Sequence, residues 1–264
     1  MRLEGKTAIV VGAGQTPGET IGNGRATAIL FAREGANVLL VDRNLQSANE
    51  TKSMIEDEGG AATAFEADVT RESDCEALVK ACVDTYGRVD ILHNNVGIAT
   101  NDAGPTHLRE DAWQNIFDVN LKSVFLTCKH TLPVMREQGS GAITNISSVA
   151  AVCSVGMLAY KTSKAGMNAL THSLAMGNAR YGIRVNAIMP GLMNTPMAIE
   201  GISAARGIPK DRLIEQRDAQ VPLGAKMGTA WDIAYAALYL ASDEAKFVTS
   251  VILPVDGGQS ARIG

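Results

Sequence analysis

The chain has 264 residues, of which 46% are apolar, and its formal charge at pH 7 is −4. This length and composition predict one domain over residues 1–264 with a large hydrophobic core. The acidic balance argues against a nucleic-acid partner, and no apolar run approaches the roughly 20 residues of a membrane span. Residues 1–6 lack a signal-peptide pattern, so we expect a cytoplasmic protein that binds no membrane.

The four cysteines predict neither a disulfide framework nor a metal site. Cys75 and Cys82 fall on an apolar stripe with helical period, which is typical of core residues. Cys128 and Cys153 stand alone, and no spacing of Cys and His suits zinc.

Residues 6–42 follow the pattern strand, glycine loop, helix, strand. An apolar run at 7–11 leads into residues 12–24, which hold five glycines, and a second apolar run covers 37–41. This pattern predicts a βαβ unit in which the glycine loop and a helix N-terminus bind a diphosphate. Asp42, at the tip of the second strand, is placed to accept hydrogen bonds from an adenosine ribose. A glycine loop without that Asp would equally fit a plain turn.

The alternation of strand and helix then continues. Residues 45–55 predict a helix, 62–65 a strand, the Cys75 stripe a helix and 89–93 a strand. The fold class is therefore α/β, a single Rossmann-type doubly wound parallel sheet of about seven strands with helices on both faces. Asp42, Asp68, Asn95 and Ser148 all fall at the carboxyl ends of predicted strands, where such sheets bind ligands. His93 lies inside an apolar strand, and we interpret it as structural.

A long helix is predicted over residues 111–135, with one polar residue on its apolar face. The apolar stripe includes Trp113, Phe117 and Phe125, and Asn120 lies on the same face. A buried amide costs about 1–3 kcal/mol if unpaired, so Asn120 should be hydrogen-bonded. It is either a satisfied core residue or a polar link that reaches the next strands, where Tyr160 and Lys164 lie.

Residues 141–164 carry the strongest chemical pattern. An apolar strand ends in Ser147 and Ser148, and a helix-like segment follows that carries Tyr160 and Lys164. Positions i and i+4 share a helix face, so the Lys164 ammonium can lie near the Tyr160 phenol and lower its pKa. A Tyr-x-x-x-Lys quartet alone is as easily a half-buried ring beside a solvated amine. The cofactor site predicted upstream favours the interpretation of Tyr160 and Lys164 as a catalytic pair.

The last third of the chain predicts two more strands, at 183–189 and 251–253, and a helix after Thr229. Between them, residues 192–226 show no clear period and are interpreted as a substrate lid. The expected substrate pocket is apolar and suggests a hydrophobic substrate; its residues are Cys153, Val155, Met157, Leu158, Met193 and Met197.

With these motifs in this order, the whole chain resembles the short-chain dehydrogenase/reductase family. The matching features are the glycine loop, Asp68-Val69, Asn94-Asn95-Val96-Gly97, Asn120, Ser147-Ser148, Tyr160-x-x-x-Lys164, the 190–195 segment and Asp256-Gly257-Gly258. The resemblance implies that Tyr160 is the general acid/base and that Lys164 lowers its pKa while binding the nicotinamide ribose. It further implies that Ser148 polarises the substrate oxygen and that Asn120 holds a water in the proton relay.

The same resemblance implies a nicotinamide dinucleotide as the cofactor and a homotetramer as the assembly. Asp42 favours NAD because a 2′-phosphate would bring like charges together. The residues that would contact the cofactor are Gly12, Ile21, Gly22, Asp42, Arg43, Asp68, Val69, Asn95, Gly97, Tyr160, Lys164, Pro190 and Thr195.

The chain departs from the family pattern at three places. The segment between Gly12 and Gly22 is about six residues longer than usual and resembles the loop of enoyl-thioester reductases, which however space Tyr and Lys more widely. Val11 replaces a common Thr. The interval from Ser148 to Tyr160 is one residue short, which leaves Ser147 as a minor candidate for the serine role.

We therefore expect an NAD-dependent oxidoreductase that moves a hydride between nicotinamide and a hydrophobic secondary alcohol or ketone. A 3-oxoacyl-thioester reductase is the enzymatic alternative, and it would be expected to prefer NADPH. A dinucleotide-binding sensor without turnover is the non-enzymatic alternative.

Overall fold

The computed structural model describes residues 1–153 and 155–262. Seven strands form a central sheet in which every pairing is parallel. In order across the sheet the strands are β3 (Ala61–Glu66), β2 (Asn37–Asp42), β1 (Thr7–Val11), β4 (Ile91–Asn94), β5 (Gly141–Ile146), β6 (Ile183–Pro190) and β9 (Ile252–Val255). This confirms the predicted fold class and strand number.

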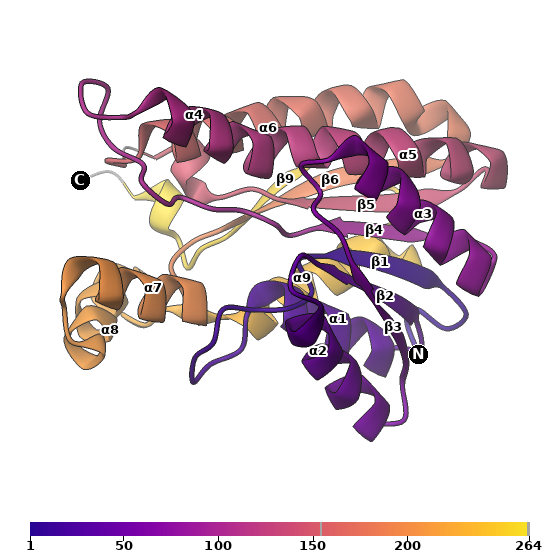
Figure 1. Ribbon diagram of the computed structural model, residues 1–264, viewed down its shortest axis with the longest axis horizontal. Coiled ribbons are helices and arrows are strands. Elements are labelled where there is room, and N and C mark those ends of the chain that lie inside the picture. The colour runs from indigo at the N-terminus through magenta and orange to yellow at the C-terminus, as the bar shows by residue number, and fades with distance from the viewer. Residues whose placement is uncertain (154, 263–264) are drawn as a thin grey trace.

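Helices cover both faces of the sheet (Figure 1). On one face lie α1 (Asn23–Arg33), α2 (Leu45–Asp57) and α9 (Ala230–Ala241); on the other lie α3 (Glu72–Tyr86), α4 (Glu110–Phe117), α5 (Ser123–Gln138) and α6 (Leu158–Asn178). None of the helices among the described residues combines the length and the hydrophobicity that a bilayer crossing requires.

Strand β1 shows why two layers of helices are needed. Ala8 and Val10 join the apolar cluster formed with α1 and α9, whereas Ile9 and Val11 join the cluster formed with α3, α5 and α6. Because successive side chains of a strand point to opposite faces, a strand that is apolar at every position must be covered on both sides.

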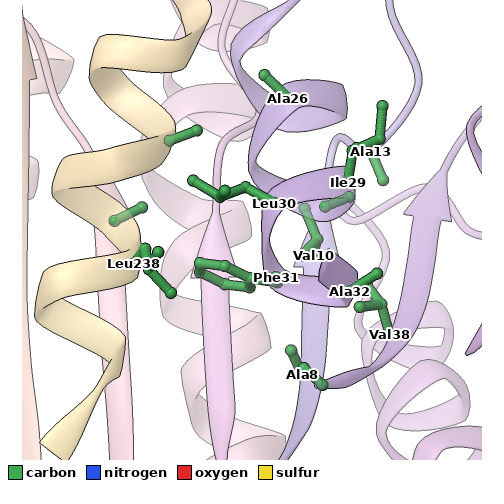
Figure 2. Close-up of a cluster of buried hydrophobic side chains, with 14 of the residues drawn as sticks. Ala8, Val10, Ala13, Ala26, Ile29, Leu30, Phe31, Ala32, Val38 and Leu238 are labelled. Carbon is green, nitrogen blue, oxygen red and sulfur yellow. The ribbon is translucent and has the colours of Figure 1, made fainter. Parts of the chain in front are cut away.

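Phe31 of α1 anchors the first cluster. It is fully buried and, with Leu30, extends from α1 toward Leu238 of α9 (Figure 2). The buried ring of His93 meets Phe31 edge to face, with centroids 6.0 Å apart, which agrees with its interpretation as structural. Truncating a buried Phe typically costs about 3–5 kcal/mol, so this contact holds α1, and the glycine loop before it, on the sheet.

The helix predicted at 111–135 is divided by a π-helical turn, Asp118–Lys122. Beyond this turn the expected apolar stripe stays buried at Val124 and Cys128, but Phe125 is 49% exposed, so its predicted burial was wrong. Asn120 lies inside the π turn and is fully buried, in keeping with the frequent occurrence of such turns at functional sites.

Residues 192–226 are more regular than predicted. They contain α7 (Pro196–Arg206) and α8 (Lys210–Asp218), and the short strand β7 (Met193–Asn194) pairs with β8 (Gly228–Thr229). Figure 1 shows α7 and α8, in orange, standing apart from the two helical layers. Leu213 is buried in α8, and Ile199 of α7 belongs to a small apolar cluster. So few buried positions explain why no long amphipathic period marks these helices.

Candidate active site

Residues from distant parts of the chain meet at the carboxyl edge of the sheet. Gly12 follows β1, Asp42 ends β2, Asn95 follows β4 and Ser148 lies two residues after β5. The order of strands reverses between β1 and β4, and such a switch point opens the crevice in which parallel sheets bind ligands.

Two glycines bring helix α1 against the ends of β1 and β4. A Cβ atom on Gly24 would lie 1.9 Å from the carbonyl oxygen of Gly12 and 2.6 Å from Nδ2 of Asn95. Gly12 has a φ of 80°, in the left-handed region that suits glycine. Asn95 Nδ2 donates a hydrogen bond to the Gly12 carbonyl at 3.2 Å. No other residue type fits at position 24 without moving the helix.

The N-terminus of α1 fits the diphosphate of a dinucleotide. Gly22 stands at its N-cap without a capping side chain, and the first turn contains no acidic residue. The Gly22 N–H donates to Oε1 of Gln15 at 2.9 Å, which closes the enlarged loop, and Ile21 is half-buried beside it. The positive end of this 11-residue helix therefore has no acidic residue in its own first turn, and such a helix end favours a bound anion.

Asp42 is tied to the glycine loop. Its Oδ2 accepts a hydrogen bond from the Gly14 N–H and its Oδ1 accepts one from the Asn44 N–H, both at 3.0 Å. A carboxylate offers about four acceptor positions, so each oxygen of Asp42 can accept a further bond. This arrangement suits a pair of ribose hydroxyls.

Asp68 and Val69 follow β3 on the same edge. A hydrogen bond from the Thr70 hydroxyl lowers the pKa of Asp68, and the nearby guanidinium groups of Arg71 and Arg43 lower it further. Arg43 is exposed and Val69 is buried. Arg43 thus lies near Asp68 and next to Asp42 in sequence.

Ser148, Tyr160 and Lys164 meet where β5 and α6 approach each other. The Ser148 hydroxyl is hydrogen-bonded to the Tyr160 phenol. Lys164 Nζ lies 5.8 Å from the centroid of the Tyr160 ring and donates to the Ile146 carbonyl at 2.7 Å. Lys164 is 2% exposed, so its ammonium is held in the interior beside the phenol.

Burial dominates the pKa values of these two side chains. It raises the pKa of Tyr160 above its ordinary value of 10, and the hydrogen bond with Ser148 counters part of this rise. It lowers the pKa of Lys164 to about 7. In the protein alone, Ser148 and not Lys164 counters the rise for Tyr160. The expected lowering by Lys164 remains a prediction for the complex with a cofactor.

The structure separates the two neighbouring serines. Ser147 is buried, and its hydroxyl donates to the Lys164 backbone carbonyl at 3.1 Å. Ser148 is half-buried, accepts a bond from the Ala150 N–H at 3.1 Å and meets Tyr160. Ser148 is therefore the one of the two serines that meets the Tyr160 phenol, and its contact with a substrate oxygen remains a prediction.

Asn120 links two segments of the site. Its Oδ1 accepts from the Ile98 N–H at 2.8 Å, and its Nδ2 donates to the Ile98 carbonyl at 2.9 Å and to the Ser163 hydroxyl at 3.0 Å. Ser163 in turn donates to the Tyr160 carbonyl at 2.8 Å. The link runs to the loop after β4 and to α6, so it reaches the segment that carries Tyr160 and Lys164, although through a helix and not through a strand. Oδ1 of Asn120 can accept one further bond.

Gly97 leaves room for the lysine. A Cβ atom at position 97 would lie 3.0 Å from Nζ of Lys164 and 3.7 Å from Oδ1 of Asn120. Sequence reasoning placed Gly97 near the cofactor but did not foresee this close approach, which joins the loop after β4 to the lysine.

The remaining predicted residues divide between site and core. Pro190 ends β6 and Thr195, 6% exposed, stands at the N-cap of α7. Of the expected pocket, Cys153, Val155, Met157 and Leu158 are half-buried and Met197 is 55% exposed. Met193 packs into the core cluster of α1 and α9, and its assignment to the pocket wall stays a prediction.

The enlarged glycine loop contacts helices α7 and α8, which sequence reasoning missed. The Glu19 backbone N–H and the Lys210 ammonium both hydrogen-bond the Glu200 carboxylate, and Lys210 Nζ also lies 3.3 Å from Oε1 of Glu19. A Cβ atom on Gly18 would lie 2.8 Å from Glu200 and from Pro196. The extra residues of the loop therefore reach the predicted lid.

Comparison with known proteins identifies the family. Residues 19–260 match the family described as "Enoyl-(Acyl carrier protein) reductase". The chain is 40% identical over 266 residues to 3beta-hydroxysteroid dehydrogenase 1 of Eggerthella lenta, covering 99% of this chain and 96% of that protein. It is 36% identical over 259 residues to the 3-oxoacyl-(acyl-carrier-protein) reductase FabG of Thermotoga maritima, covering 98% of this chain and 99% of that protein.

A solved structure agrees with this match. The crystal structure of a short-chain dehydrogenase/reductase from Burkholderia xenovorans superposes with a TM-score of 0.94 at 44% identity, covering 100% of this chain and 99% of that chain. Sequence and fold thus agree over nearly the whole length. The chain belongs to the short-chain dehydrogenase/reductase family, whose dehydrogenases are oxidoreductases that bind a nicotinamide dinucleotide.

Proposed function

We propose that this protein is an NAD-dependent oxidoreductase that interconverts a hydrophobic secondary alcohol and its ketone. The observation that carries the proposal is the meeting of Ser148, Tyr160 and Lys164 on the carboxyl edge of the sheet, beside the glycine loop. Such a group can move a proton at a substrate oxygen.

The dinucleotide would lie across the switch point. The loop from Gly12 to Gly22 and the N-terminus of α1 would hold its diphosphate, and Asp42 would bind the adenosine ribose. Asn95 and Lys164 would hold the nicotinamide half. When bound, the nicotinamide accepts or donates the hydride.

The side chains of this protein would then handle the proton. Tyr160 exchanges a proton with the substrate oxygen, which the Ser148 hydroxyl polarises. Hydrogen-bond acceptors on the ribose would favour the charged form of Lys164, which then stabilises the phenolate of Tyr160. Asn120 Oδ1, with its spare acceptor position, would hold a water that connects this group to solvent.

Two observations bear on the substrate. The half-buried apolar residues Cys153, Val155, Met157 and Leu158 support a hydrophobic substrate, and the Eggerthella lenta relative is a hydroxysteroid dehydrogenase by name. The Thermotoga maritima relative supports a 3-oxoacyl-thioester reductase as the alternative. A sensor without turnover has less support, because the four residues that would move the proton are all present. They are Asn120, Ser148, Tyr160 and Lys164.

The test is a nicotinamide fluorescence assay with a panel of secondary alcohols and acyl thioesters. Oxidation of hydrophobic alcohols with NAD supports the proposal. Turnover restricted to 3-oxoacyl thioesters with NADPH would favour the alternative, and dinucleotide binding without any turnover would favour a sensor.

The proposal includes residues 192–226 as a lid over the substrate. Its two helices bury few side chains, since Leu213 is the buried residue of α8 and Pro196 and Ile199 are those of α7. Segments with few buried apolar contacts open most easily. The contacts of Glu19 and Gly18 with this segment would connect its position to that of the cofactor loop.

We also propose a homotetramer in the cytoplasm. Three exposed aromatic side chains on α9 and just after it support an interface there: Tyr235 is 58%, Tyr239 37% and Phe247 100% exposed. The free state of all four cysteines fits a reducing compartment. Sedimentation should show a tetramer that Phe247→Glu weakens; a monomeric wild type would contradict the assembly.

A further inference from the structure

Helix α6 lacks a capping side chain of its own at the end that carries Tyr160. Met157, at its N-cap, makes no capping hydrogen bond, and the first turn contains no acidic residue. The first N–H groups of a helix have no partner within the helix. They need another acceptor, because a buried or half-buried N–H without one is costly.

Asp102 supplies this acceptor from the loop between β4 and α4. Its Oδ2 accepts a hydrogen bond from the Tyr160 N–H at 2.7 Å, and its Oδ1 accepts one from the Ala159 N–H at 3.1 Å. These are the third and second residues of α6, the positions that a capping side chain reaches from the N-cap. The negative charge also suits the positive end of the helix. A residue 58 positions away in the chain thus takes the place of a local cap.

The loop around Asp102 has a shape that delivers the carboxylate. Asn101 has a φ of 60°, in the left-handed region that residues other than glycine rarely adopt. The Asp102 N–H donates to the Ala99 carbonyl at 3.2 Å, and Oδ1 accepts a further bond from the Ala103 N–H at 2.8 Å. A strained backbone persists where surrounding contacts hold it, and the two bonds to α6 are contacts of this kind.

We propose that Asp102 is a positioning residue for proton transfer at Tyr160, an inference that rests on the function proposed above. By holding the Tyr160 N–H, Asp102 fixes the first turn of α6 and thereby the place of the phenol beside the Ser148 hydroxyl. A misplacement of about 1 Å can lower a rate by about 10²-fold. The carboxylate therefore contributes to turnover without acting on the substrate itself.

Replacing Asp102 should lower turnover while leaving the binding of substrate and cofactor nearly unchanged. Asp102→Ala is expected to lower kcat by about tenfold to 100-fold, while the KM for substrate and the Kd for NAD change by less than about twofold. Asp111→Ala is the matched control, because Asp111 has an exposed carboxylate that pairs with Arg109 at the surface. This control should keep the kcat of the wild type.

A local cap should make Asp102 dispensable. Met157→Ser places a hydroxyl at the N-cap of α6, where it can accept the N–H bonds that Asp102 accepts in the wild type. In the Met157→Ser background, Asp102→Ala should lower kcat by less than about threefold. Comparison with Met157→Ser alone removes any effect of that change on the substrate.

Equal kcat in wild type and Asp102→Ala, or the same loss with and without Met157→Ser, would overturn the proposal. If Asp102→Ala does not fold, Asp102→Asn keeps one acceptor and nearly the same volume. Its smaller loss of kcat must then also shrink in the Met157→Ser background, and an unchanged loss would again overturn the proposal.

Tyr160→Phe is assayed in parallel, so that a failure of the proposed function can be distinguished from a failure of the proposed role of Asp102. Near-normal turnover of Tyr160→Phe would remove the proposed function. Low turnover of that variant together with an unimpaired Asp102→Ala would overturn the role of Asp102 alone.

Discussion

Replacing Lys164 with Met should stabilise the cofactor-free protein while removing its activity. Lys164 is 2% exposed, and burial lowers its pKa from 10.5 to about 7. This difference in pKa corresponds to about 5 kcal/mol of free energy lost by burying the charged amine. Met has a similar length and no charge. The lost hydrogen bond to the Ile146 carbonyl offsets about 1 kcal/mol of the gain.

The sign of the pH dependence follows from the two pKa values. Between about pH 7 and pH 10.5 the unfolded chain binds more protons at Lys164 than the native protein does, so the stability of the wild type rises with pH across this window. Below about pH 7 Lys164 is protonated in both states, and the full free-energy cost of burying its charge applies. Before the lost hydrogen bond is counted, the advantage of Lys164→Met should be about 5 kcal/mol at pH 6 and about 2 kcal/mol at pH 9.

Urea unfolding at pH 6 and pH 9, without dinucleotide, measures this difference. Lys80→Met is the matched control, because the Lys80 side chain is 73% exposed and its replacement should change stability little at either pH. Identical pH dependence of the wild type and Lys164→Met, or a Lys164→Met protein less stable than the wild type at pH 6, would refute the reasoning.

Three further predictions concern the relay, the cofactor and the lid. Asn120→Ala should lower turnover more than it lowers NAD affinity. It should also lower the Tm somewhat, because the Ile98 backbone and the Ser163 hydroxyl lose partners. Normal turnover with a lower Tm would leave Asn120 a purely structural role. NAD should be favoured over NADP by about 10²-fold or more in kcat/KM. Asp42→Ala should narrow this ratio, because it weakens the binding of NAD and relieves the repulsion of the 2′-phosphate of NADP. A wild-type preference for NADP would contradict the assignment of Asp42 to the adenosine ribose. Residues 192–226 should exchange amide hydrogens faster than the sheet in the free enzyme and become protected in the ternary complex; equal protection in both states would exclude a lid.

Much of the fold was predictable because the sheet is buried on both faces. A parallel strand covered by helices is apolar at every position, as residues 7–11 and 37–41 nearly are, and such runs stand out between glycines and polar helices. The same topology brings the residues after each strand to one edge. Asp42, Asn95 and Ser148 could therefore be placed near one another before any contact was known.

Irregular helix geometry and the individual contacts made by loops were not predictable. The π turn at Asp118–Lys122 has no composition signal, and Phe125 is exposed although its neighbour Val124 on the expected apolar stripe is buried. The cap that Asp102 provides for α6 and the approach of Gly18 to Glu200 depend on loop shapes that no periodicity encodes. A missing local cap before Tyr160 is the one signal that could have prompted a search for a distant acceptor.

The most direct test of the central claim is the turnover of Tyr160→Phe, measured with NAD and an alcohol that the wild type oxidises. Phe keeps the ring and removes the transferable proton, so kcat should fall by about 10²–10⁴-fold while the Kd for NAD in the same preparation barely changes. Tyr86→Phe, which removes a phenol bonded to Thr63 elsewhere in the fold, should keep normal turnover. Near-normal turnover of Tyr160→Phe would contradict the account, because no proton would then have to pass through that phenol.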